Sequence, residues 1–104
     1  MFENKIVYLN DIKAISEKLK KNHSSIAAVY LFGSYAKETQ DEWSDIDLAV
    51  IMKNDCEYNE SLQIYSEGKD YDPRIDAITF SEKDFEIENM PVISEIRTTG
   101  LRVL

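Results

Sequence analysis

Three aspartates in this sequence stand where a carboxylate needs a partner. Asp45 and Asp47 flank Ile46 at the start of one apolar run, and Asp76 lies inside another. Side chains two residues apart on a strand project to the same face, so Asp45 and Asp47 would present their carboxylates together. Such carboxylates repel one another unless a cation lies between them, and Mg²⁺ prefers oxygen ligands of this kind. Neighbouring strands would bring Asp76 to the pair, which predicts a site for one or two Mg²⁺ ions.

A glycine and a serine end the first apolar run of the chain. Gly33 would let the backbone turn sharply and leave room for a ligand close to it. Ser34 is predicted to cap a short helix over residues 34–38, whose free N–H groups would face a phosphate. The Ser34 hydroxyl would donate a further hydrogen bond to that phosphate. Taken alone, such a pair is more often an ordinary turn, so its weight depends on what lies near it.

Other chemically capable residues receive simpler interpretations. Asp70 and Asp72 repeat the Asp-x-Asp spacing in a stretch without strand character, and we interpret them as part of a solvated loop. His23 is the only histidine and lies at a predicted helix end, where capping is favoured over catalysis. Cys56 is the only cysteine, which excludes an intrachain disulfide and a cysteine metal cluster.

The elements that must position these residues follow from the hydrophobic pattern. Apolar runs predict strands at 26–32, 46–52 and 74–80, with a short edge strand at 101–104. Helical spacing and end signals predict helices at 11–22, 57–67 and 91–99. Asn10 would cap the first helix, Ser81 and Asp84 would form a capping box, and Pro91 and Gly100 would bound the last helix. This order predicts an α/β fold with a mixed sheet of three to four strands flanked by helices.

Size and charge exclude several classes of partner and location. The chain has 104 residues, of which 43% are hydrophobic, and this fits one compact domain over residues 1–104. Its net charge is −8, so direct binding to nucleic acid is not expected. The sequence shows neither a signal peptide nor a segment that could span a bilayer, so we expect a cytoplasmic protein without a membrane partner.

The spacing of the two motifs is specific. Gly33-Ser34, a ten-residue gap and Asp45-Ile46-Asp47 together resemble the signature of the DNA polymerase β-like nucleotidyltransferase superfamily. Chance would produce the full pattern roughly 0.002 times in such a chain. The surrounding residues, and Arg74-Ile75-Asp76-Ala77-Ile78, resemble the minimal nucleotidyltransferase branch over residues 10–104. The resemblance implies the nucleotidyltransferase fold, catalytic Asp45, Asp47 and Asp76 that bind Mg²⁺, and contact of Gly33 and Ser34 with the triphosphate of ATP.

The branch also suggests a partner. Its members are often antitoxins paired with a helical HEPN-domain RNase toxin, and some transfer AMP from ATP to a tyrosine of that toxin. The resemblance therefore implies a protein adenylyltransferase that acts as an antitoxin. Two alternatives stay open: an antitoxin that acts by contact alone with a weak or vestigial nucleotide site, and transfer to a small molecule such as an aminoglycoside. A homo-oligomer also stays open.

One segment departs from the family. The residues after Gly33-Ser34 are frequently rich in arginine in the family, whereas residues 35–42 here hold a single basic residue, Lys37. Lys37 is the candidate to meet the phosphates. A solvent-exposed helix charge explains it at least as well.

Overall fold

The computed structural model describes residues 9–36, 44–87 and 90–104. Four strands form one sheet in the order β3-β2-β1-β4. In it β1 pairs antiparallel with β2 and β4, and β2 pairs parallel with β3, which confirms the predicted mixed sheet. The elements in chain order are α1 (Leu9–Asn22), β1 (Ile26–Phe32), β2 (Ile46–Met52), α2 (Tyr58–Tyr71), β3 (Ile75–Ser81), α3 (Glu82–Phe85), α4 (Pro91–Thr99) and β4 (Leu101–Arg102).

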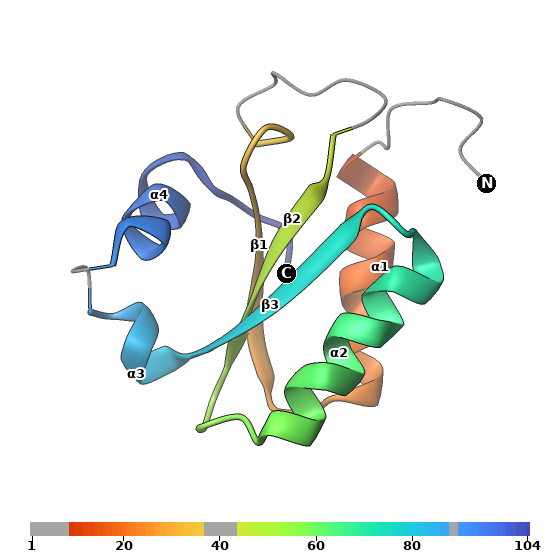
Figure 1. The fold of residues 1–104 in the computed structure, drawn as a ribbon, viewed down its shortest axis with the longest axis horizontal. Helices are drawn as coiled ribbons and strands as arrows, with labels where there is room; N and C mark the ends of the chain where they lie inside the picture. The colour runs from red at the N-terminus through yellow and green to blue at the C-terminus, as the bar shows by residue number, and fades with distance from the viewer. Residues whose placement is uncertain (1–8, 37–43, 88–89) are drawn as a thin grey trace.

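The sheet lies between two layers of helices (Figure 1). Helices α1 and α2 cover one face, where Ile12, Leu19 and Ile64 pack against alternate strand residues in the larger core. Helices α3 and α4 lie on the other face, where Ile96 and Phe85 belong to a smaller core. Because both faces of β2 are covered, its sequence is an apolar run rather than an alternating one. Asp47 is the one acidic residue within that run.

Several predicted boundaries hold. The backbone N–H of Asp84 donates to Ser81 Oγ at 3.1 Å, as the capping box requires. Pro91 begins α4, and Gly100 follows its last residue. The edge strand predicted over 101–104 is present but shorter, and as β4 it covers Leu101–Arg102 and pairs with β1. No helix among the described residues has the length and apolar character needed to cross a membrane.

Other boundaries were wrong. Helix α1 begins at Leu9, so Asn10 lies inside the helix and does not cap it. Residues 33–36 form turns rather than the start of the predicted helix, and residues 37–43 lie outside the described part. Helix α2 continues to Tyr71, beyond the predicted end at residue 67, and Gly68 within it packs against β3. A Cβ at Gly68 would lie 2.9 Å from Ile75 Cγ2, so only glycine lets the helix approach the strand this closely.

Asp72 was also misread as part of a solvated loop. Its side chain is 1% exposed and follows α2 directly. The Asp72 carboxylate accepts the backbone N–H of Arg74 at 3.0 Å and pairs with the Arg74 guanidinium at 3.2 Å. Asp72 therefore fixes the connection between α2 and β3, whereas Asp70 is an exposed residue of α2.

His23 joins two helices instead of capping one. Its buried imidazole lies at the end of α1, with Nδ1 3.2 Å from Glu60 Oε2 and Nε2 in contact with Glu67 Oε2. Both glutamates belong to α2. Burial alone lowers the pKa of His23, but hydrogen bonds and charges from Glu67 and Glu60 outweigh it and raise the pKa. This contact therefore binds α1 to α2 most firmly when the imidazole is protonated.

Candidate active site

Two of the predicted aspartates are neighbours across the parallel strand pair. Asp47 of β2 and Asp76 of β3 are register partners, so their side chains project from the same face of the sheet. Asp45 is exposed and immediately precedes β2. The structure therefore brings Asp47 and Asp76 together as predicted, whereas Asp45 lies at the same end of the sheet but outside the strand pair.

The carboxylates influence one another. Burial raises the pKa of Asp47, and the negative charges of Asp76, Asp45 and Glu95 raise it further. Glu95 lies on α4, the helix that covers this face of the sheet. A carboxylate in such surroundings is costly to ionise, and a bound cation would remove the cost.

Gly33 lies directly against Asp47. Residue Phe32 pairs with Asp47 across β1 and β2, and the chain then turns at Gly33 with a φ of 75°. A Cβ built on Gly33 would overlap Asp47 Oδ2. Gly33 is therefore needed twice, for a backbone conformation that other residues rarely adopt and for the space that the Asp47 carboxylate occupies. Ser34 follows it in the turn and is partly buried, while Lys37 lies outside the described residues.

Lys69 and Tyr65 reach Asp76, and neither was predicted as a site residue. Lys69 Nζ donates to Asp76 Oδ1 at 2.8 Å, and the Tyr65 hydroxyl lies 3.5 Å from the same oxygen. The hydrogen bond to Asp76 raises the pKa of Lys69. Lys69 follows Tyr65 by four positions, so both lie on one face of α2. That spacing was visible in the sequence, but the predicted helix ended at residue 67.

The donor set fits Mg²⁺ in part. Among the described residues, no three His, Cys, Asp or Glu side chains are close enough together to hold a metal ion. Asp47 and Asp76 nevertheless supply paired oxygen donors, and Mg²⁺ in nucleotide sites commonly uses one or two carboxylates plus substrate phosphates and water. Burial raises the pKa of Asp47 most, and the neighbouring charge of Asp76 adds to it, so a cation bound between the two carboxylates would favour their ionised forms. The chemistry of these residues therefore fits Mg²⁺ that arrives with a polyphosphate.

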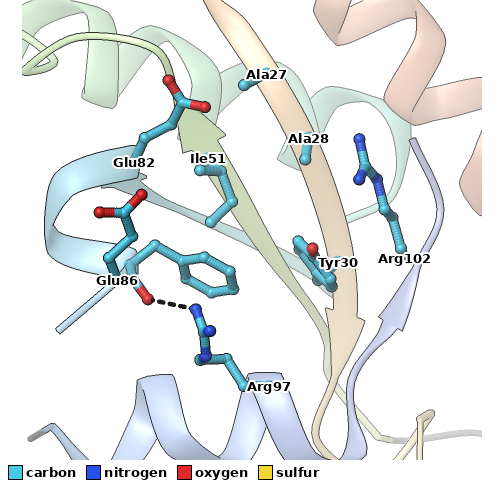
Figure 2. A pocket seen from close by; sticks show the side chains of 9 residues that line it. Ala27, Ala28, Tyr30, Ile51, Glu82, Glu86, Arg97 and Arg102 are labelled. Carbon is cyan, nitrogen blue, oxygen red and sulfur yellow. Dashed lines mark hydrogen bonds between the residues drawn. The ribbon is translucent and has the colours of Figure 1, made fainter. Parts of the chain in front are cut away.

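A separate cavity of about 320 Å³ lies on the same side of the sheet (Figure 2). Its lining includes Ala28 and Ile51, register partners near the end of β2 that is remote from Asp47. Arg97 lines one side of the cavity and donates to the backbone oxygen of Phe85 at 3.0 Å. The lining holds Glu82 of α3 and Glu86, which follows that helix, together with one arginine from α4 and one from β4, so the cavity favours neither anions nor cations.

Comparison with known proteins agrees with this architecture. The family model described as "Polymerase beta, Nucleotidyltransferase" matches residues 13–101. No curated protein matches the chain.

Solved structures share the fold at low sequence identity. A toxin–antitoxin crystal structure with AMP-PNP aligns with a TM-score of 0.71 and 21% identity, over 94% of this chain and 73% of that one. A putative nucleotidyltransferase from Sulfolobus solfataricus aligns with a TM-score of 0.63 and 20% identity, over 90% and 77%. A tri-AMPylated Shewanella oneidensis HEPN toxin in complex with its MNT antitoxin gives a TM-score of 0.62 and 18% identity, over 93% and 72%. At these identities the likeness establishes the fold.

Proposed function

The chain belongs to the polymerase beta nucleotidyltransferase family, and on that premise we propose that it transfers AMP from ATP to a tyrosine hydroxyl of a helical HEPN-domain toxin, and so acts as an antitoxin. The observation that carries this proposal is the pairing of Asp47 with Asp76 beside Gly33. A polyphosphate site needs paired carboxylates beside a backbone turn, and this end of the sheet offers both. The reaction would take place in the cytoplasm, where ATP and Mg²⁺ are available.

Each site residue has a distinct task in this reaction. Asp45, Asp47 and Asp76 would hold one or two Mg²⁺ ions, which when bound offset the charge of the triphosphate and of the leaving group. Gly33 keeps the space in which the Asp47 carboxylate lies. Ser34 would donate to a phosphate oxygen, and Lys37 would add a positive charge there.

The transfer step is an in-line displacement. The acceptor oxygen forms a bond to the α-phosphorus of ATP while the bond from that phosphorus to the bridging oxygen breaks, and pyrophosphate leaves. Asp76 is the candidate to take the proton of the acceptor hydroxyl. Its position on an edge strand of the sheet supports access by a side chain from another protein.

The partner is proposed from the structural neighbours. Two of them are described as toxin–antitoxin complexes, one with AMP-PNP and one with an AMPylated HEPN toxin. These descriptions apply to those proteins, and the shared fold makes the same reaction the natural first test for this chain.

The test uses ATP labelled at the α-phosphate, Mg²⁺ and the product of the gene next to that of this chain. We expect label on a tyrosine of the partner with the wild-type chain, and none with Asp47→Asn. Gln63→Glu is a control for change at an exposed site of α2 and should leave labelling intact. Tight complex formation without label, equal in Asp47→Asn, would instead support an antitoxin that acts by contact. Label on an added aminoglycoside, with none on protein, would support the small-molecule alternative.

A further inference from the structure

We propose that Lys69 is a tethered counter-cation. In the free protein its ammonium group pairs with the Asp76 carboxylate where a divalent cation would otherwise bind, so divalent-metal binding depends on the nucleotide. The inference rests on the proposed function only in taking Asp76 as a metal ligand. It assigns Lys69 a role that the motif residues do not cover.

The position of Lys69 is defined by several contacts. Its Nζ donates to Asp76 Oδ1 at 2.8 Å and to the backbone oxygen of Pro73 at 3.0 Å. The same atom lies 5.3 Å from the centre of the Tyr65 ring, within reach of a cation–π interaction. Lys69 is 33% exposed and Asp76 27% exposed, so the pair is partly shielded from water. A lysine held by a carboxylate, a carbonyl and an aromatic ring has a fixed place, unlike an ordinary surface lysine.

The topology explains how a helix residue reaches this carboxylate. Ile75 and Ala77 belong to the core beneath α1 and α2, so Asp76 between them projects from the opposite face. Strand β3 is the edge strand of the sheet. A long side chain from the last turn of α2 can therefore pass around the edge and meet Asp76 from outside the sheet.

The charge arrangement gives this contact a consequence. A divalent cation that binds Asp76 in the free protein must displace the ammonium group or lie close to it, and the two positive charges repel. A triphosphate changes the balance, because its oxygens offer the ammonium group another anionic partner. Metal and nucleotide then favour each other's binding, and by thermodynamic reciprocity each raises the affinity of the other by the same factor.

The test measures Mn²⁺ binding to the full chain by electron paramagnetic resonance, without nucleotide and with the non-hydrolysable analogue AMP-PNP. Without nucleotide, Lys69→Met should bind Mn²⁺ about tenfold more tightly than wild type, since a repelling positive charge roughly 6 Å away is removed. Lys69→Arg, which keeps the charge, should stay near wild type. With the analogue, the gain in Mn²⁺ affinity that the nucleotide causes should be smaller in Lys69→Met than in wild type.

Matched variants separate this effect from changes in net charge and folding. Lys53 is exposed just beyond the other end of β2, so Lys53→Met makes the same charge change away from the site and should leave Mn²⁺ affinity near wild type. In an Asp76→Asn background, Lys69→Met should no longer tighten Mn²⁺ binding. Circular dichroism identifies any variant that fails to fold, and Lys69→Gln then replaces Lys69→Met.

The outcomes are independent of AMP transfer. Equal or weaker Mn²⁺ binding by folded Lys69→Met overturns the inference, even if the wild-type chain labels its partner. Tighter binding by Lys69→Met supports it, even if no acceptor is ever labelled. A gain of the same size in Lys53→Met would also overturn it, because the cause would then be net charge.

Discussion

The substitution Gly33→Ala tests the geometry on which the site depends. Gly33 has a φ of 75°, and a Cβ added there would overlap Asp47 Oδ2. The first feature strains the backbone of any residue with a side chain. The second forces the Asp47 carboxylate away from its place beside Asp76.

The two effects have separate magnitudes. An alanine in the left-handed region costs about 1–2 kcal/mol. Moving the Asp47 carboxylate out of its rotamer costs about 1 kcal/mol more. The lower entropy of the unfolded alanine chain offsets under about 1 kcal/mol. We therefore expect Gly33→Ala to lower the free energy of unfolding by about 1–3 kcal/mol. On the proposed function, AMP transfer should fall at least about 100-fold, because the carboxylate proposed as a metal ligand is displaced.

A double-mutant cycle isolates the contact. In Asp47→Ala the carboxylate is gone, and the remaining Asp47 Cβ position lies 3.6 Å from the added methyl group, an ordinary contact. In that background Gly33→Ala should cost about 1 kcal/mol less, because the backbone strain alone remains. Urea unfolding followed by far-ultraviolet circular dichroism measures all four proteins. An equal cost in both backgrounds would refute the argued overlap, and a cost near zero in both would refute the strained turn as well.

Three further substitutions test other contacts by urea unfolding. His23→Gln should lower the free energy of unfolding by about 1–2 kcal/mol at pH 6. Because the folded pKa of His23 is raised above its ordinary 6.5, this loss should be fully present below pH 6.5 and disappear as the pH rises through the folded pKa. A loss independent of pH would contradict the charged contact. Asp47→Asn should raise the free energy of unfolding at pH 7, because the raised pKa of Asp47 means that its ionised form destabilises the native state. This gain should vanish below the pKa of Asp47 in the unfolded chain. A loss of stability at pH 7 would contradict the unfavourable ionisation of Asp47. Gly68→Ala should destabilise the protein by about 1 kcal/mol despite the better helix propensity of alanine, since the added methyl group meets Ile75. The loss should reverse in an Ile75→Ala background. A net gain in the wild-type background would show that α2 can shift.

The strands and their aspartates could be predicted from the sequence because the signals for both are local. Ile46 to Met52 is apolar except for Asp47, and the run around Asp76 has the same form. A strand buried on both faces keeps a charged residue only where a polar group or a cation offsets the charge. Asp47 and Asp76 are register partners, so the two charged positions share one place in the sheet. The role of these residues as metal ligands stays a prediction.

What the sequence could not reveal depends on distant partners. His23 contacts Glu60 and Glu67 on α2, which lie 37 and 44 residues away, and no local sequence pattern predicts these contacts. Lys69 was not predicted as a site residue because it lies beyond the helix predicted over 57–67, whereas α2 continues to Tyr71 and contacts β3 at Gly68. Asp72 was the avoidable error, because its partner Arg74 is only two residues away, and aspartate commonly accepts such a backbone N–H in turns.

The exposure around Asp76 is in keeping with the proposal of a protein acceptor. Ile78, two residues after Asp76 on the same face of β3, is 44% exposed, and Tyr65 beside Asp76 is 38% exposed. An acceptor that approached as a small polar molecule would leave these apolar groups in water, whereas a tyrosine carried on a protein surface could cover them while its hydroxyl meets the carboxylate. Substitution of Ile78 by Ser should therefore weaken transfer to a protein partner through its KM, with less effect on binding of ATP alone, and an unchanged KM would count against a protein surface at this edge.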